Sequence, residues 1–306
     1  MLLQRILTAL VLIPLIIGAV FYLPSNAYFS YFSVVMAVIV LIGAWEWTNL
    51  ASIDKLWQKL LFLLLLIAPM IGITLWTQFL ELMATVLEWQ DLKEYSGAIE
   101  WTVFGPVLFW VLMMILIRKV PNALLQLQLK TVYKALIGWF VLLAAWMFIT
   151  RLHTLYQGGM VMYFLILIWS ADVFAYFVGK KFGKEKLAPD ISPGKTVEGF
   201  YGALGAGLLC GIGFNIYNKL VHGEDVVYGT LHYVTSFDFV LLSVLTVLTS
   251  VYGDLFFSLV KRQKGVKDTG SILPGHGGIL DRVDSVIAAV PFFYAGIFLI
   301  SRGVLG

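Results

Sequence analysis

The stretch FVLLSVLTVLTSVYGDLFF, residues 239–257, decides the fold of this chain. It holds a single charged residue, and it is long enough to cross about 30 Å of hydrocarbon as an α-helix. Backbone polar groups in lipid must satisfy one another, so an apolar block of this length is expected to be helical. The stretch therefore predicts a membrane-spanning helix that carries an acid, Asp254, near one end.

Similar apolar blocks recur along the 306 residues. Hydrophobic residues make up 60% of the chain, charged residues 13%, and the mean hydropathy is +0.90. Soluble domains rarely have this composition, so the fold class predicted is all-α, a polytopic integral membrane helical bundle. We expect a surface-lying helix at residues 79–87, which are too few to cross. About nine transmembrane helices are expected, near residues 7–23, 29–47, 57–76, 101–117, 132–150, 161–178, 200–217, 239–257 and 286–301.

Charge sets the expected orientation of these helices. With the loops assigned alternately to the two sides, one side receives seventeen of the 21 Lys and Arg residues. By the positive-inside rule that side is cytoplasmic, which places the amino terminus inside and the carboxyl terminus outside. The formal net charge of +3 is too small to imply a nucleic-acid partner. A single membrane-embedded domain, residues 1–306, is expected, with amino-terminal helices in 1–150 and a catalytic half in 151–306.

Two polar segments interrupt the apolar pattern on the predicted cytoplasmic side. They are GKKFGKEKLAPDISPGKTVEG, residues 179–199, and KRQKGVKDTGSILPGHGGILDRVD, residues 261–284. Eight of the 24 residues in the second segment are charged. Both segments are long for connections in a helical bundle and rich in Lys and Gly. Such segments on the nucleotide-containing side of a membrane indicate a site for an anionic ligand.

Three acids near the second segment suit a cation. Asp281 and Asp284 are three residues apart, so both carboxylates fall on one face of a first helical turn. Mg²⁺ usually takes one or two carboxylates together with substrate phosphate oxygens, although a capping pair at a helix start would have the same spacing. Asp254 favours the metal, because a carboxylate among apolar residues at that depth is costly unless it is paired or binds a cation. An interhelical hydrogen bond or ion pair is the structural alternative for Asp254.

Other polar residues lie close to these acids in the sequence. Asp172 lies inside an expected span, one turn before Tyr176, and an interhelical contact is its structural alternative. Ser258 shares a helical face with Asp254. His276, between two glycines, could donate to a leaving phosphate or hold the loop by hydrogen bonds.

Basic residues stand beside glycine in both segments. Glycine lets a backbone approach an oxyanion closely, and Lys supplies a compact charge for phosphate. Ordinary positive-inside anchoring is the alternative for these bases, and SPGKT, residues 192–196, lacks the GxxxxGK[ST] spacing of a P-loop. Acids, bases and glycine together suit metal-assisted phosphoryl or nucleotidyl transfer, which needs positioning and charge neutralisation more than a covalent nucleophile.

Extended back to Ser258, the second segment resembles the signature of the phosphatidate cytidylyltransferase family, also called CDP-diglyceride synthases. SLVKRQKGVKDTGSILPGHGGILDRVD, residues 258–284, fits the family pattern over 27 consecutive residues. The upstream DVFAYFVGKKFGKEKLAPDISPGKTVEG, residues 172–199, resembles the family's second block, and GAWEWTNL, residues 43–50 around Glu46, resembles a looser amino-terminal feature. Matching positions in the second block are Asp172, Ala175, Tyr176, Gly179, Gly183, Ser192, Pro193, Lys195, Thr196, Glu198 and Gly199.

The resemblance implies a reaction in which CTP and phosphatidic acid give CDP-diacylglycerol and pyrophosphate in phospholipid biosynthesis. It implies that Asp254, Asp281 and Asp284 hold a divalent cation, Mg²⁺, against the CTP phosphates, and it allows a second cation such as K⁺. Polar contacts to substrate are expected from Ser192, Thr196, Ser258, Gly277, Gly278, Asp172 and Tyr176. The bases expected to neutralise the triphosphate and the lipid head group are Lys195, Lys261, Arg262, Lys267 and Arg282. Asp268 and His276 are expected to organise the loop or take part in the chemistry.

Alternatives remain at this point. A relative that uses another lipid acceptor, such as a polyprenyl lipid, or a CTP-dependent lipid kinase, would show similar head-group residues. A transporter would use Asp172 and Asp254 as coupling sites and predicts polar residues spread along several spans, and a structural scaffold would explain none of the signature. The resemblance also implies a homodimer. The size of the chain and the lack of a long polar amino terminus indicate a bacterial inner membrane, and the charge count places the active site at the cytoplasmic face.

Overall fold

The computed structural model describes residues 2–23, 25–26, 29–88, 97–222, 236–273, 275 and 277–301, and within these ranges it is dominated by long helices. Seven helices of the described residues are long and apolar enough to cross a membrane, and a shorter apolar helical stretch lies at Leu10–Phe21. This confirms the all-α polytopic class. The helices are α1 (Leu2–Phe21), α2 (Tyr31–Leu50), α3 (Leu56–Val86), α5 (Phe104–Lys119), α6 (Pro121–Gln126), α7 (Thr131–Phe182), α8 (Val197–His222), α9 (Ser236–Lys264) and α10 (Leu280–Ser301), and the 3-10 helix η1 (Gly97–Val103) precedes α5.

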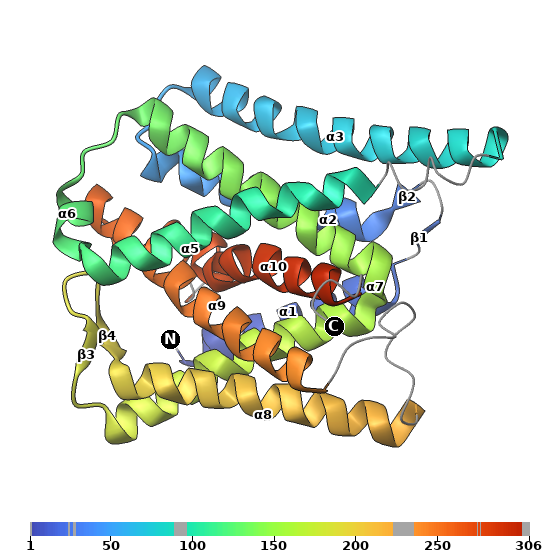
Figure 1. Ribbon diagram of the computed structural model, residues 1–306. Helices are drawn as coiled ribbons and strands as arrows, with labels where there is room; N and C mark the ends of the chain where they lie inside the picture. Colours follow the sequence, from blue (N-terminus) through green and yellow to red (C-terminus); the bar gives the residue numbers. More distant parts are fainter. Residues whose placement is uncertain are drawn as a thin grey trace.

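Helix α7 contains two of the expected spans, residues 132–150 and 161–178. Its 52 residues are interrupted at Gln157, whose φ of 64° and ψ of 174° are not helical. The first arm runs across the bundle and the second arm returns, so that α6 and the β3–β4 hairpin, which flank α7 in the sequence, lie at the same end (Figure 1). The expected division of the chain at residue 150 falls inside the first arm of α7.

Helix α3 corrects one expectation. It continues through residues 79–87, where a separate surface-lying helix was predicted, and ends only at Val86. No glycine or proline follows Gly72 in this helix, and the hydroxyls of Thr74 and Thr77 bond back to carbonyls within the helix. A 31-residue helix is about 46 Å long, so α3 projects beyond the rest of the bundle (Figure 1).

Two short hairpins join the helices. Strand β1 (Ser25–Asn26) pairs with β2 (Phe29–Ser30), and β3 (Lys186–Ala188) pairs antiparallel with β4 (Ser192–Thr196). The SPGKT segment, which was expected to be a loop, is therefore strand β4. In β3–β4 the Cα of Lys186 lies opposite Thr196 and that of Ala188 opposite Ser192, with an irregularity in the register between these two pairs.

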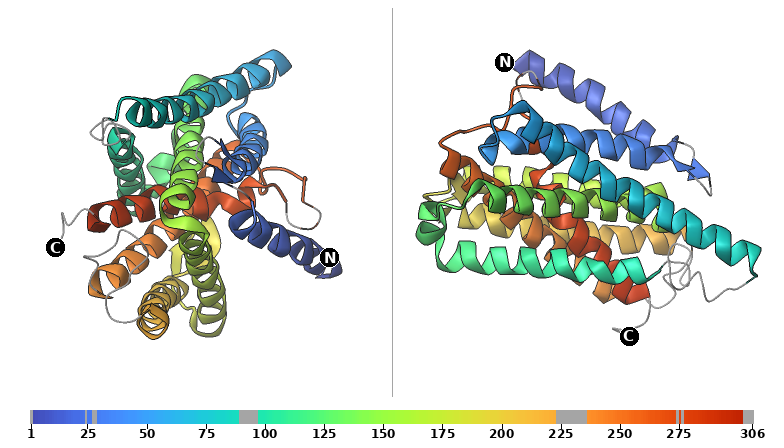
Figure 2. Two further views of the ribbon diagram at one scale, coloured as in Figure 1. Left: turned by 90° about the vertical axis from the view of Figure 1, so that its right-hand side faces the viewer. Right: turned by 90° about the horizontal axis from the view of Figure 1, so that it is seen from above.

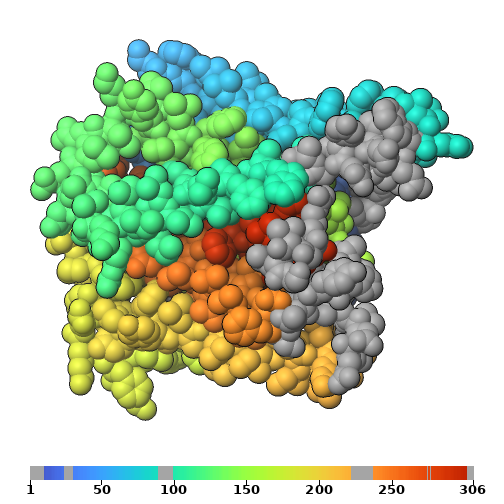
Figure 3. Space-filling view, viewed as in Figure 1, coloured from blue at the N-terminus to red at the C-terminus, as the bar shows by residue number. Residues whose placement is uncertain are grey.

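Helix α10 forms the centre of the bundle. It is the most deeply buried of the long helices in the described residues and packs against α9, α7 and α5. In the space-filling view it is visible only as a narrow strip between α5 and α9 (Figure 3). Helices α1 and α3 lie at the periphery when the bundle is seen from its end (Figure 2). The first turn of α10 is therefore held by several elements at once.

A buried ion pair fastens the end of the bundle opposite the β3–β4 hairpin. Glu100 of η1, 3% exposed, accepts hydrogen bonds from the Arg151 guanidinium of α7 and from the Tyr294 hydroxyl of α10. Breaking such a pair from one side leaves an uncompensated buried charge. The contact ties the amino-terminal helices to α7 and α10, and so holds α10 from its far end.

Candidate active site

The close approach of α9 and α10 brings two of the predicted acids together. A Cβ atom on Gly253 would lie 2.2 Å from the Cβ of Ala288 and 3.3 Å from the carbonyl oxygen of Asp284. Only glycine permits this spacing, because real Cβ atoms do not approach so closely. The next residue, Asp254, interacts electrostatically with Asp284 of α10 and with Asp172 of α7. Three helices thus contribute acids to one end of the bundle.

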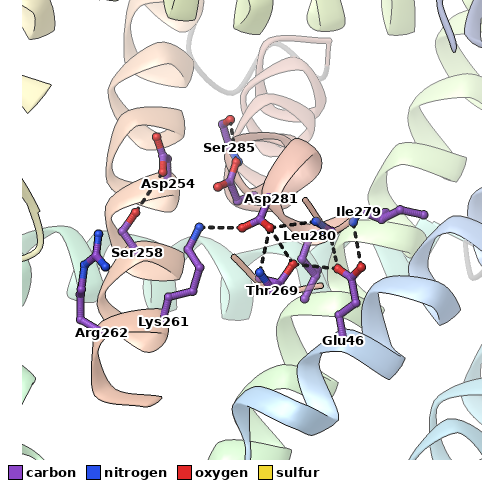
Figure 4. A network of polar contacts seen from close by, with 12 residues as sticks. Glu46, Asp254, Ser258, Lys261, Arg262, Thr269, Ile279, Leu280, Asp281 and Ser285 are labelled. Atoms are coloured by element: carbon purple, nitrogen blue, oxygen red, sulfur yellow. Dashed lines mark hydrogen bonds and ion pairs between the residues drawn. The ribbon is translucent and has the colours of Figure 1, made fainter. Parts of the chain in front are cut away.

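The β3–β4 hairpin brings a base to this acid cluster. The Nζ atom of Lys195 lies 2.7 Å from Oδ2 of Asp254 and donates a hydrogen bond to the carbonyl of Val251 at 3.3 Å. The hydroxyl of Ser258, one turn along α9, donates to Oδ1 of Asp254 at 3.3 Å (Figure 4). The structure therefore brings Lys195 of the first polar segment to the part of α9 that leads into the second.

Asp281 is surrounded by donors from its own protein. Its Oδ1 accepts a hydrogen bond from Nζ of Lys261 at 2.7 Å. Its Oδ2 accepts from the backbone N–H groups of Thr269 at 2.8 Å and Gly278 at 3.0 Å, and from the Thr269 hydroxyl at 3.1 Å (Figure 4). The side chain is 5% exposed. Asp281 consequently anchors α9 and the loop before α10 to the start of α10.

Glu46 is a member of this network that sequence reasoning did not assign. It lies on α2, is 2% exposed, and accepts hydrogen bonds from the N–H groups of Ile279 and Leu280, each at 2.9 Å. The hydroxyl of Thr269 also donates to Glu46, at 2.8 Å (Figure 4). Its signal in the sequence was an acid alone in an apolar span, in GAWEWTNL. No local pattern pairs it with residues more than 200 positions away.

The three predicted acids differ in how well they suit a divalent cation. In the ranges that the structure describes, no three His, Cys, Asp or Glu side chains gather closely enough to hold a metal by themselves. Two carboxylates suffice for Mg²⁺ when substrate phosphates complete its shell. Asp284 is 7% exposed, and among the described residues its Oδ1 accepts hydrogen bonds from the N–H and the hydroxyl of Ser285. Asp254 and Asp284 therefore fit a cation best. Both oxygens of Asp281 accept hydrogen bonds in a deeply buried setting, whereas the Lys195–Asp254 pair is partly exposed and can exchange its contact for a ligand.

The chain was compared with known proteins. A family model described as "Cytidylyltransferase family" matches residues 3–300. The chain belongs to this family. Over 303 residues it is 34% identical to a phosphatidate cytidylyltransferase of Haemophilus influenzae, covering 96% of this chain and 97% of that protein. A phosphatidate cytidylyltransferase of Pseudomonas aeruginosa is 34% identical over 297 residues, 96% of each chain, and one of Bacillus subtilis is 42% identical over 149 residues, 47% of this chain and 50% of that protein.

Some residues predicted to contact substrate support the fold of this family member. The Arg262 guanidinium donates to the carbonyl of Ile191 at 3.2 Å and so holds the β3–β4 hairpin against α9. The Thr196 hydroxyl, buried at the end of β4, accepts the N–H of Gly199 at 3.1 Å in the first turn of α8. Gly278, expected beside substrate, lies in this structure beside the carboxylate of Asp281. Roles of these residues toward substrate stay predictions.

Most of the remaining predicted residues are exposed. Gly277 has a φ of 82° and closes a tight turn in which the N–H of Leu273 bonds to its carbonyl at 2.9 Å. Tyr176 is 60% exposed, and its ring faces Nζ of Lys180 at 5.7 Å rather than the acids. His276 lies outside the described residues, so its predicted role stays open. Also exposed are Asp172, Lys267, Asp268 and Arg282, whereas Ser192 is partly buried in β4.

Proposed function

We propose that this protein is a phosphatidate cytidylyltransferase, which forms CDP-diacylglycerol and pyrophosphate from CTP and phosphatidic acid. The relatives of that name match it over 96% of the chain. The observation that carries the proposal is the meeting of Asp254 and Asp284 with Lys195 and Lys261 at one end of the bundle. A triphosphate and a lipid phosphate are both anions, and such a set of charges reduces their mutual repulsion.

In the proposed reaction an oxygen of the lipid phosphate bonds to the α-phosphorus of CTP, and the bond from that phosphorus to pyrophosphate breaks. Asp254 and Asp284 would hold Mg²⁺, which when bound neutralises phosphate charge and orients the triphosphate. Lys195 is placed to exchange its contact with Asp254 for a phosphate oxygen, because that pair is partly exposed. Lys261, whose charge acts on Asp254 and Asp284, stabilises the negative charge that develops on the departing pyrophosphate.

The site is proposed to face the cytoplasm of a bacterial inner membrane. The two polar segments, residues 179–199 and 261–284, hold ten of the chain's 21 Lys and Arg residues. They lie at the same end of the bundle as α6 (Figure 1). The positive-inside rule then places this end where CTP is available, while phosphatidic acid reaches it from the leaflet.

The decisive experiment uses CTP labelled at the α- or at the γ-phosphate. Protein purified in detergent is incubated with phosphatidic acid and Mg²⁺, and the label in the lipid phase is measured. Cytidylyl transfer carries only the α-label into lipid and releases pyrophosphate, whereas a lipid kinase carries only the γ-label. Polyprenyl phosphate in place of phosphatidic acid tests the other acceptor class. Label in lipid only from γ-labelled CTP, or only with the polyprenyl acceptor, would refute the proposal.

A variant tests the cation site within this proposal. We expect Asp284→Asn to lower turnover on the order of 100-fold or more, because one of two cation ligands is lost. The same change should leave the free energy of unfolding equal or raise it, because it removes a buried charge next to Asp254. Asp190→Asn, an exposed acid in the turn of the hairpin, is the matched control and should change neither quantity. Wild-type turnover in Asp284→Asn would remove this residue from the site.

A further inference from the structure

The loop before α10 is organised around a carboxylate from another part of the chain. Glu46 of α2 receives the N–H groups of Ile279 and Leu280, which are at the start of α10 and have no partners within that helix. The carboxylate therefore acts as the cap of α10, although it lies 233 residues away from Ile279 in the sequence. A negative charge at a helix start is favoured by the helix dipole.

Glycine at two loop positions makes room for this carboxylate. A Cβ on Gly278 would lie 2.4 Å from Oε2 of Glu46 and 2.1 Å from the Thr269 hydroxyl. A Cβ on Gly270 would lie 2.6 Å from Oε1 of Glu46. Neither position admits a larger residue without moving the carboxylate. The glycines of this loop are thus explained by the approach of an anion, which here belongs to the protein itself.

Thr269 connects Glu46 to Asp281. Its hydroxyl lies 2.8 Å from Oε2 of Glu46 and 3.1 Å from Oδ2 of Asp281, and its N–H donates to the same Oδ2. Asp284 follows one turn later on α10, beside Asp254. A shift of the first turn of α10 would therefore move both Asp281 and Asp284 relative to α9.

We propose that Glu46 is a positioning residue for the transfer reaction. By capping α10 and holding Thr269, it fixes the orientation of Asp281 and Asp284 toward the acids and bases of α9 and β4. Glu46 itself is too buried to contact substrate. The catalytic consequence rests on the proposed function, whereas the structural consequence can be measured without any substrate.

The substitution Glu46→Gln tests this role. A carboxamide has one acceptor oxygen, so its nitrogen must face the N–H of Ile279 or that of Leu280. We expect hydrogen exchange of the amides in residues 277–284 to accelerate by on the order of 10- to 100-fold in the substrate-free protein. Turnover should fall through kcat, with KM for phosphatidic acid unchanged, since the lipid is not contacted.

A second variant keeps the proposal testable should Glu46→Gln not fold. Thr269→Val preserves the shape of the side chain and its N–H bond to Asp281 but removes the hydroxyl bridge. It should accelerate exchange in the same residues and lower kcat in the same direction. Glu81→Gln and Thr85→Val, exposed positions on α3, are the matched controls and should change neither quantity.

The outcomes separate this proposal from the proposed function. Unchanged exchange at residues 277–284 in a folded Glu46→Gln or Thr269→Val variant overturns the positioning role, whatever the protein catalyses. Faster amide exchange together with a raised KM for phosphatidic acid and an unchanged kcat also overturns the positioning role. If exchange is faster in the variants but the wild-type protein transfers no label from CTP to phosphatidic acid, the capping of α10 by Glu46 is supported and the proposed reaction is rejected.

Discussion

The contact between Lys261 and Asp281 should stabilise the protein before any substrate binds. The two side chains are 12% and 5% exposed, and 2.7 Å separates the ammonium nitrogen from the carboxylate oxygen. Removing one partner of a buried pair costs about 3–5 kcal/mol, and a single hydrogen bond to a charged group is worth about 1.5–3 kcal/mol. Asp281 keeps three other donor contacts, so we expect Lys261→Met to cost about 2–3 kcal/mol of unfolding free energy.

A double-mutant cycle isolates this pair. Asp281→Asn is the second change, and its amide nitrogen must face either Lys261 or the N–H groups of Thr269 and Gly278, so it should be costly too. Unfolding free energies are measured by SDS titration in mixed micelles without nucleotide. The coupling energy between the two substitutions should be about 1.5–3 kcal/mol.

The control cycle combines Asp281→Asn with Lys264→Met. Lys264 lies one turn further along α9, is exposed, and bonds to Ser52 rather than to Asp281. Its coupling to Asp281→Asn should stay within about 0.5 kcal/mol of zero. If the coupling energy between Lys261→Met and Asp281→Asn is as close to zero as in the control cycle, the Lys261–Asp281 pair does not stabilise the protein.

Two further predictions separate chemistry from packing. Lys195→Met should lower turnover on the order of 100-fold while costing at most about 1 kcal/mol of stability, and Lys186→Met on the neighbouring strand should leave kcat unchanged. Gly253→Ala should lower the free energy of unfolding by about 1–3 kcal/mol, because the added Cβ would meet Ala288, whereas Gly205→Ala on α8, with open space around it, should be neutral or stabilising. Thermal unfolding in detergent compares the two variants. Equal effects would contradict the close contact between α9 and α10.

Much of the membrane fold could be predicted from the sequence because apolar length is a local property. Residues 239–257 and most of the other apolar blocks lie in helices. Helix α9 continues past residue 257 to Lys264, so Asp254 lies farther from the end of its helix than predicted. The error at residues 79–87 has a local cause as well. A helix continues past the apolar span for as long as no residue ends it. A count of consecutive apolar residues does not detect this continuation.

The internal organisation of the site could be predicted only in part. The signature joined Lys261 and Asp281 as candidates, because both lie in one segment and one family pattern. Asp254 became a candidate because it is an acid inside an apolar span. Glu46 could not be given its role, since hydrogen bonds to Ile279 and Leu280 depend on how α2 packs beside α10. Long-range pairing of this kind is a tertiary property that spacing along one chain does not encode.

The exposure of the two lysine pairs assigns them different tasks. The Lys195–Asp254 pair is 25% and 31% exposed, and a pair with that access to water contributes about 1 kcal/mol or less, so phosphate can replace the carboxylate at little cost. The Lys261–Asp281 pair is more deeply buried, and Asp281 also accepts hydrogen bonds from Thr269 and Gly278. Exchange there would leave a buried carboxylate short of a donor. Substrate affinity and turnover should therefore respond first to changes at Lys195, and stability first to changes at Lys261, even though both bases lie beside the same acids.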